Sequence, residues 1–152
     1  MNFKNIIVLV SILIFSGCEY KIPSPQRGFN SSTVSTNKVY VLVNREQSSM
    51  MSKYDAIENN IAYMLRANNL QVTLIDSIEK NGQDGILLKI ISVHTDTTVR
   101  KKLYANYSIQ NNLTDIILIN ETVGASSFLL SYSKLANVIG EKIVRNVLLC
   151  LY

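Results

Sequence analysis

The fold is decided by the stretch Lys38-Val39-Tyr40-Val41-Leu42-Val43-Asn44. Its β-branched and aromatic side chains are typical of a β-strand. Apolar residues occupy both of the alternating positions, which predicts a strand that is covered on both faces or lies at the centre of a sheet. An ordered domain is therefore expected to begin at residue 38.

A helix is predicted directly after this strand, over about residues 52–68. Ser52 is a suitable N-cap, and the pair Asn68-Asn69 is a suitable stop. Apolar side chains recur in the segment at spacings of three and four, so that they form one stripe. The members of this stripe are Tyr54, Ile57, Ile61, Met64 and Leu65.

Four more strands and a second helix are predicted in the rest of the chain. One of the strands alternates apolar and polar residues from Leu103 to Ile109, which is typical of a half-buried antiparallel strand. The last helix carries one apolar stripe that includes Leu135, Ile139 and Ile143. The strands are expected at residues 70–75, 86–93, 103–109 and 115–123, and the helix at 127–151.

The predicted order of elements is therefore β-α-β-β-β-β-α. Each helix has a single apolar stripe to bury, and a sheet face can cover two such stripes at once. We expect an α+β fold in which two helices pack on one face of a mostly antiparallel sheet of four to five strands.

The segment ahead of the domain has the features of an export signal. Lys4 is followed by an apolar run of about ten residues, which is half the length that a membrane-spanning helix needs. The run ends in Phe15-Ser16-Gly17-Cys18, where small residues precede a cysteine that can accept a diacylglycerol. The sequence thus predicts a lipoprotein signal peptide over residues 1–17 and lipidation of Cys18. An ordinary signal peptide with an incidental cysteine is the alternative.

A lipidated tether is predicted over residues 18–37. This segment contains Pro23, Pro25 and Gly28 and little that could bury a face, so it can hold the domain of residues 38–152 away from a bilayer. Glu19 follows the cysteine. An aspartate at that place would favour retention in the inner membrane, so we expect the outer membrane.

Composition argues against several classes of function. The formal net charge of +4 falls to +3 when the predicted signal, with Lys4 and no acid, is removed, which is too little to indicate a nucleic-acid binder. His94 is the only histidine, so one chain cannot form a Ser-His-Asp triad or a multi-histidine zinc site. We expect no enzymatic activity, no cofactor and no metal.

The remaining candidate residues have plain structural interpretations. We expect His94 to be solvated or to lie at the edge of the core. Cys150 is expected to be a small buried apolar residue without a disulfide partner. Asp96, Asp115 and Glu121 are expected at strand ends and turns.

One concentrated basic feature remains, at Arg100, Lys101 and Lys102. It lies between two predicted strands or at the start of the second. The plain interpretation is a solvated hairpin end. The functional interpretation is a site for anionic groups, with lipid A phosphates as the candidate, because clustered cations offset the cost of desolvating phosphates.

Four stretches, taken in order, resemble the LPS-assembly lipoprotein LptE family in its alphaproteobacterial form. The segment 18–23 is similar to the family's start after the lipidated cysteine, with Glu19 in place of the usual glycine, and 57–61 lies where the family's first helix begins. The stretch from Thr97 to Ile109 resembles a family strand, on which only Arg100 of the three cations matches. The stretch 131–137 is similar to the start of the last helix, with Leu135 where the family has tyrosine.

The resemblance implies both a fold and a role. The fold would be two helices on a four-stranded sheet. The role would be that of an outer-membrane lipoprotein that plugs the LptD β-barrel, assists its assembly and receives lipopolysaccharide (LPS), by binding and without covalent chemistry. Two other interpretations stay open: a periplasm-facing subunit of a secretion or conjugation apparatus, and a small ligand-binding or immunity lipoprotein.

Overall fold

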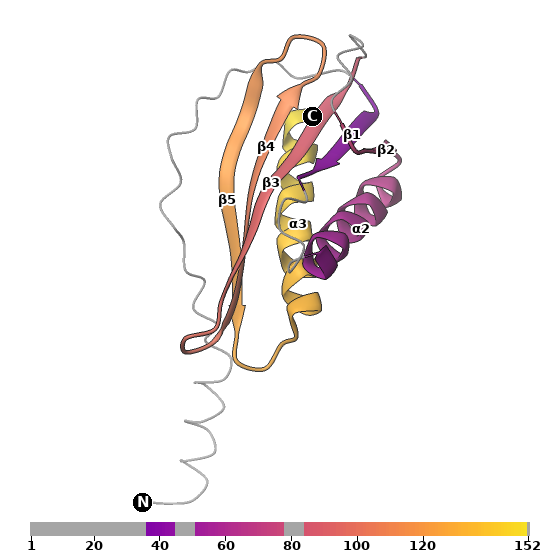
Figure 1. The fold of residues 1–152 in the computed structure, drawn as a ribbon. Coiled ribbons are helices and arrows are strands. Elements are labelled where there is room, and N and C mark those ends of the chain that lie inside the picture. Colours follow the sequence, from indigo (N-terminus) through magenta and orange to yellow (C-terminus); the bar gives the residue numbers. More distant parts are fainter. Residues whose placement is uncertain (1–35, 45–50, 78–83, 152) are drawn as a thin grey trace, which may run out of the picture.

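The computed structural model describes residues 36–44, 51–77 and 84–151, which form one sheet with two helices against it (Figure 1). The predicted signal peptide, Cys18 and most of the predicted tether lie outside these residues. The strands are β1 (Lys38–Val43), β2 (Gln71–Ile75), β3 (Ile86–Asp96), β4 (Lys101–Asn111) and β5 (Ile117–Ser127), and the helices are α2 (Met51–Ala67) and α3 (Tyr132–Leu151).

The five strands lie in the order β2-β1-β3-β4-β5. The long strands β3, β4 and β5 form antiparallel ladders, whereas the short strands β1 and β2 run parallel to each other and β1 runs parallel to β3. The sheet is therefore mixed, where the sequence predicted a mostly antiparallel one. The parallel part arises because α2 carries the chain from the end of β1 back to the start of β2.

Strand β1 lies between β2 and β3, as its apolar run predicted. Val39, Val41 and Val43 are buried towards the helices, while Tyr40 and Leu42 on the other face are half-buried. A strand in this place has neighbours on both sides, so its backbone groups are paired and both its faces favour apolar side chains.

Both helices pack on the same face of the sheet, α2 beside α3 (Figure 1). This confirms the predicted α+β fold. The core between the layers contains the predicted stripes, with Tyr54, Ile57, Ile61 and Leu65 from α2 and Leu135, Ile139, Ile143 and Val147 from α3. Helix α2 ends as Asn69 adopts a left-handed conformation with φ 60°, which asparagine tolerates at a helix stop.

The antiparallel part of the sheet extends well beyond β1. Strand β1 pairs with β3 only as far as Val43 opposite Ile90, whereas β3 continues to Asp96 opposite Lys102. The free ends of β3, β4 and β5 therefore project as a three-stranded ribbon. At the foot of this ribbon in Figure 1 lie the β3–β4 turn and the β5–α3 connection.

Helix α3 begins five residues later than predicted, at Tyr132 instead of Ser127. Ser127 is instead the last residue of β5, where it pairs with Lys101 of β4. The Ser131 hydroxyl accepts a hydrogen bond from the backbone N–H of Lys134 at 3.3 Å, which makes Ser131 the N-cap. Both serines are good cap residues, and pairing with β4 decides between them.

Candidate functional site

The basic residues singled out in the sequence lie at the foot of the projecting ribbon. Arg100 ends the β3–β4 turn, and Lys101 and Lys102 begin β4. Lys101 is exposed, and the other two side chains are partly buried. This position agrees both with a solvated hairpin end and with a site for anionic groups. The partners of each cation must therefore decide between the two interpretations.

Lys102 is engaged within the hairpin. Its ammonium Nζ lies 2.7 Å from Oδ2 of Asp96, and Oδ1 of the same carboxylate accepts hydrogen bonds from the backbone N–H and the hydroxyl of Thr98. The Lys102 ammonium and these Thr98 groups hold the pKa of the Asp96 carboxyl well below its ordinary value. The same pair raises the pKa of Lys102. Lys102 therefore stabilises the turn and is a poor candidate for a ligand contact.

Arg100 and Lys101 differ from Lys102 in this respect. Within the described part of the chain, neither side chain has an ion-pair partner. Of the three predicted contact residues, these two retain charge that is available to an anion.

Exposed apolar residues neighbour these two cations along the chain and across the β4–β5 pair. Val99 precedes Arg100 in the turn, and Phe128 and Leu129 follow Ser127, which pairs with Lys101. We call this group, consisting of Val99, Arg100, Lys101, Phe128 and Leu129, the apolar–basic tip. Sequence reasoning found its cations but missed its apolar part, because residues 127–129 were assigned to the last helix.

The two turns of the tip are held by side-chain hydrogen bonds. The Ser127 hydroxyl oxygen accepts the backbone N–H groups of Leu129 and Leu130, each at 3.1 Å. In the β3–β4 turn, the Asp96 carboxylate accepts a hydrogen bond from the backbone N–H of Thr98. Such turns satisfy the backbone without a partner chain, so the apolar side chains at the tip are presented by a defined backbone.

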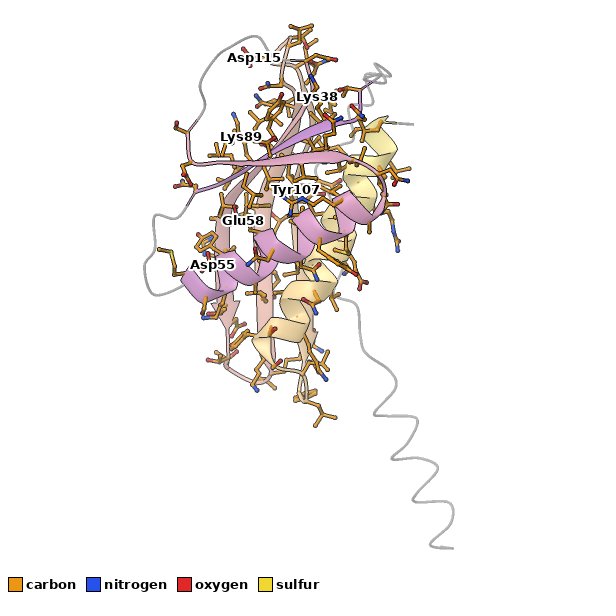
Figure 2. All side chains as sticks on the ribbon, turned by 90° about the vertical axis from the view of Figure 1, so that its right-hand side faces the viewer. Lys38, Asp55, Glu58, Lys89, Tyr107 and Asp115 are labelled. Atoms are coloured by element: carbon orange, nitrogen blue, oxygen red, sulfur yellow. The ribbon has the colours of Figure 1, made fainter. Side chains whose placement is uncertain are left out.

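In Figure 2, Asp115 in the β4–β5 turn and Lys38 at the start of β1 both lie towards the upper end of the domain. Asp115 lies in a turn, as predicted, with φ 57°. The register of the strands puts this turn and the first residues of β1 at the opposite end of the sheet from the tip. The domain thus has two distinct ends, one at which the described chain begins and one formed by the tip.

A second polar cluster lies between α3 and the sheet, around the buried Tyr107 labelled in Figure 2. The Tyr107 hydroxyl donates to Glu121 Oε2 at 3.2 Å, and the Asn146 amide donates both to that oxygen and to the Tyr107 hydroxyl. Glu121 was predicted at a strand end or turn. That is wrong, because Glu121 lies in the middle of β5 on the helix-covered face, opposite Tyr107.

This buried cluster has a structural explanation. Burial, the largest cause, raises the pKa of Tyr107, so its hydroxyl stays protonated and donates. Within the cluster, the Tyr107 hydroxyl, the Glu121 carboxylate and the Asn146 amide satisfy one another, as buried polar groups usually do. The cluster ties Asn146 of α3 to β4 and β5 and fixes how the helix lies on the sheet.

His94 lies on the sheet face that the helices leave open. It is exposed, as the plain interpretation predicted, and its Nε2 lies 3.0 Å from the Ser92 hydroxyl. Ser92 also accepts a hydrogen bond from Asn106, which in turn accepts one from Thr122. The result is a polar row across three strands.

Cys150 was predicted to be a small buried apolar residue; it packs against the core, as an apolar residue would, but it is only half-buried. Burial raises the pKa of its thiol to about 11. Among the described residues there is no group of three or more side chains that could hold a metal ion. Within the same residues, no helix has both the length and the apolarity needed to cross a membrane.

Comparison with known proteins gives similar structures but no similar sequences. No family model and no curated protein matches this chain. A minor lipoprotein from Acinetobacter baumannii has a TM-score of 0.54 at 13% identity, over 73% of this chain and 91% of its own. The PelC dodecamer from Paraburkholderia phytofirmans has a TM-score of 0.58 at 12% identity, over 82% of this chain and 94% of its own.

These likenesses concern the fold. A point variant of the PelC dodecamer from the same organism, in a second crystal form, agrees, with a TM-score of 0.59 at 13% identity over 82% of this chain and 96% of its own. The two-helix, mixed-sheet domain is thus a fold that a protein described as a lipoprotein also has. This is consistent with the lipoprotein character that the N-terminal sequence predicts.

Proposed function

We propose that this chain is an outer-membrane lipoprotein, anchored by a lipid on Cys18, that supports LPS transport and assembly as plug and partner of an LptD-type β-barrel. It acts by binding its partners, and it uses no covalent chemistry, no metal and no cofactor. The observation that carries the proposal is the pair of cations Arg100 and Lys101, which have no ion-pair partner among the described residues and lie in the stretch that resembles the LptE family.

The chemistry of these two cations suits lipid A phosphates. A guanidinium group can bind phosphate oxygens through two parallel hydrogen bonds, and an ammonium group adds a point charge beside it. Lys102, which the sequence also predicted as a contact residue, is excluded because it forms an ion pair with Asp96. The contact residues proposed for LPS are therefore Arg100 and Lys101.

A second candidate is a subunit of a multi-copy secretion or conjugation apparatus that faces the periplasm. It is favoured by the likeness to the PelC dodecamer, in which a domain of the same fold assembles in twelve copies. In this case the partner is further copies of this chain, and LPS is not required.

A detergent pull-down of the full-length tagged chain from its own envelope, read by mass spectrometry, separates the two candidates. Recovery of one large outer-membrane β-barrel, together with LPS, supports the first. Recovery of secretion-apparatus subunits or of many copies of the chain alone supports the second and contradicts the first.

A charge variant sharpens this test. The double substitution Arg100→Gln with Lys101→Gln should keep the barrel and lose most of the LPS. The matched control, Lys38→Gln with Arg145→Gln, removes the same charge from exposed positions outside the tip and should keep both.

A further inference from the structure

The apolar–basic tip contains the two most exposed large apolar side chains of the described residues. Leu129 is 82% exposed and Val99 is 79% exposed, and Phe128 beside them is 69% exposed. Single exposed apolar residues are normal on a protein surface. Three of them on two turns, next to two cations that have no ion-pair partner in the described part of the chain, are a specific combination. The tip is therefore complementary to a partner that has both an apolar interior and negative charge.

We propose that the apolar–basic tip docks on the surface of an anionic lipid bilayer, with Val99, Phe128 and Leu129 inserted among the acyl chains. Arg100 and Lys101 then lie at the level of the headgroup phosphates. Membrane-surface segments combine these features, with aromatic and aliphatic side chains in the interface and basic side chains at the headgroups.

The shape of the tip favours a bilayer over a protein partner. The tip is formed by two turns at the end of a ribbon that projects past β1, so it is a protruding end of the domain (Figure 1). Stable protein interfaces bury about 800 Å² on each partner and need a broad surface. A bilayer can accept a protruding apolar end at any place, because its acyl chains rearrange around it.

The defined turns support the same inference. The hydrogen bonds to Ser127 and Asp96 hold the two turns from within, so the apolar side chains protrude from a fixed backbone. A backbone that is already held in place loses little conformational freedom when its side chains insert. Because Lys102 is neutralised by Asp96, the docking charge is that of Arg100 and Lys101.

The proposed anchor is compatible with this orientation. About twenty residues separate Cys18 from β1, and such a chain can span about 65 Å when extended. An 11-residue strand is about 37 Å long. The tip lies at the far end of the sheet from the start of β1. The segment between Cys18 and β1 is nevertheless long enough for the lipid on Cys18 to reach the bilayer on which the tip docks. This step rests on the proposed lipidation of Cys18, but it needs neither LPS nor a barrel.

Tryptophan reporters can test the docking directly, because the natural chain contains no tryptophan. The full lipidated chain carrying Phe128→Trp is reconstituted in vesicles of phosphatidylcholine with or without phosphatidylglycerol, free of LPS. Quenching of its fluorescence by brominated acyl chains then measures insertion. The matched controls are Tyr63→Trp on α2, where the side chain is 73% exposed, and Leu113→Trp in the β4–β5 turn, where it is 58% exposed.

We expect strong quenching and a blue-shifted emission for Phe128→Trp in the anionic vesicles only, with the two controls unquenched. Adding Arg100→Gln and Lys101→Gln should lower the ratio of docked to undocked tip about 25-fold, because each charge that is removed lowers this ratio about fivefold. Adding Lys38→Gln and Arg145→Gln instead should leave it unchanged. The protein that floats with the vesicles in a density gradient is anchored. If Phe128→Trp in this protein is quenched no more than Tyr63→Trp, the docking proposal is overturned while the anchoring stands.

Discussion

The Lys102 ammonium lies 2.7 Å from Oδ2 of Asp96, and this ion pair joins the end of β3 to the start of β4. Three neighbouring cations therefore have two different roles. Lys102 stabilises the hairpin, whereas Arg100 and Lys101 remain available to a ligand or a surface. Removing the Asp96 carboxylate would release the charge of Lys102 and loosen the Thr98 turn at the same time.

The substitution Asp96→Asn should lower the free energy of unfolding at pH 7, and the difference from wild type should vanish in acid. Since the hydrogen bonds from Lys102 and Thr98 lower the pKa of Asp96 in the folded state, its contribution is complete above the unfolded pKa of about 4 and is lost as the pH falls through the lower, folded value. Urea unfolding at pH 7 and at stepwise lower pH measures this. Asp115→Asn, in the opposite turn, is the control. A difference that is equally large in strong acid would contradict the proposed role of the carboxylate.

Tyr107→Phe should lower the free energy of unfolding by about 1–2 kcal/mol, because it removes the hydroxyl that joins Asn146 and Glu121 in the buried cluster. Tyr104→Phe removes the same group from a half-exposed position on the open face and should change stability by less than about 0.5 kcal/mol. Unfolding curves in urea compare the two. Equal effects would mean that the cluster does not stabilise the packing of α3.

Gly140→Ala should destabilise the crossing of α2 and α3. A Cβ at this position would overlap Oδ1 of Asn60, whose amide donates to Asn137 at 3.0 Å across the helices. We expect a net loss of about 1 kcal/mol although alanine is the better helix former. In an Asn60→Ala background the same substitution should be neutral or stabilising. An identical effect in both backgrounds would show that the close contact is unimportant.

The Cys150 thiol should react slowly at neutral pH. Burial raises its pKa to about 11, so little thiolate is present below pH 9. Alkylation by iodoacetamide, followed by mass spectrometry across pH, should therefore rise steeply only above pH 9. Fast alkylation with a midpoint near the ordinary thiol pKa would contradict the half-buried position of the thiol.

The regular elements were predictable from the sequence because their patterns are local. The apolar stripes of α2 and α3 and the alternation from Leu103 to Ile109 report directly which side faces the core. The ends of β5 were not predictable in the same way. Residues 124–127 have no apolar alternation, and their extended conformation depends on pairing with β4, which is a contact distant in sequence.

The site was predictable only in part for the same reason. Arg100, Lys101 and Lys102 were visible as a run, but nothing in the run distinguishes Lys102, whose partner Asp96 lies across the turn. Phe128 and Leu129 joined the site only through the pairing of Lys101 with Ser127.

Lipid attachment at Cys18 is the claim on which the proposed anchoring, partner and docking all depend. It is tested most directly by labelled palmitate uptake into the full-length chain, with Cys150→Ser as the matched control at the only other cysteine. We predict that wild type and Cys150→Ser incorporate the label and that Cys18→Ser does not. Unchanged labelling of Cys18→Ser, or no labelling of the wild type, would contradict the account.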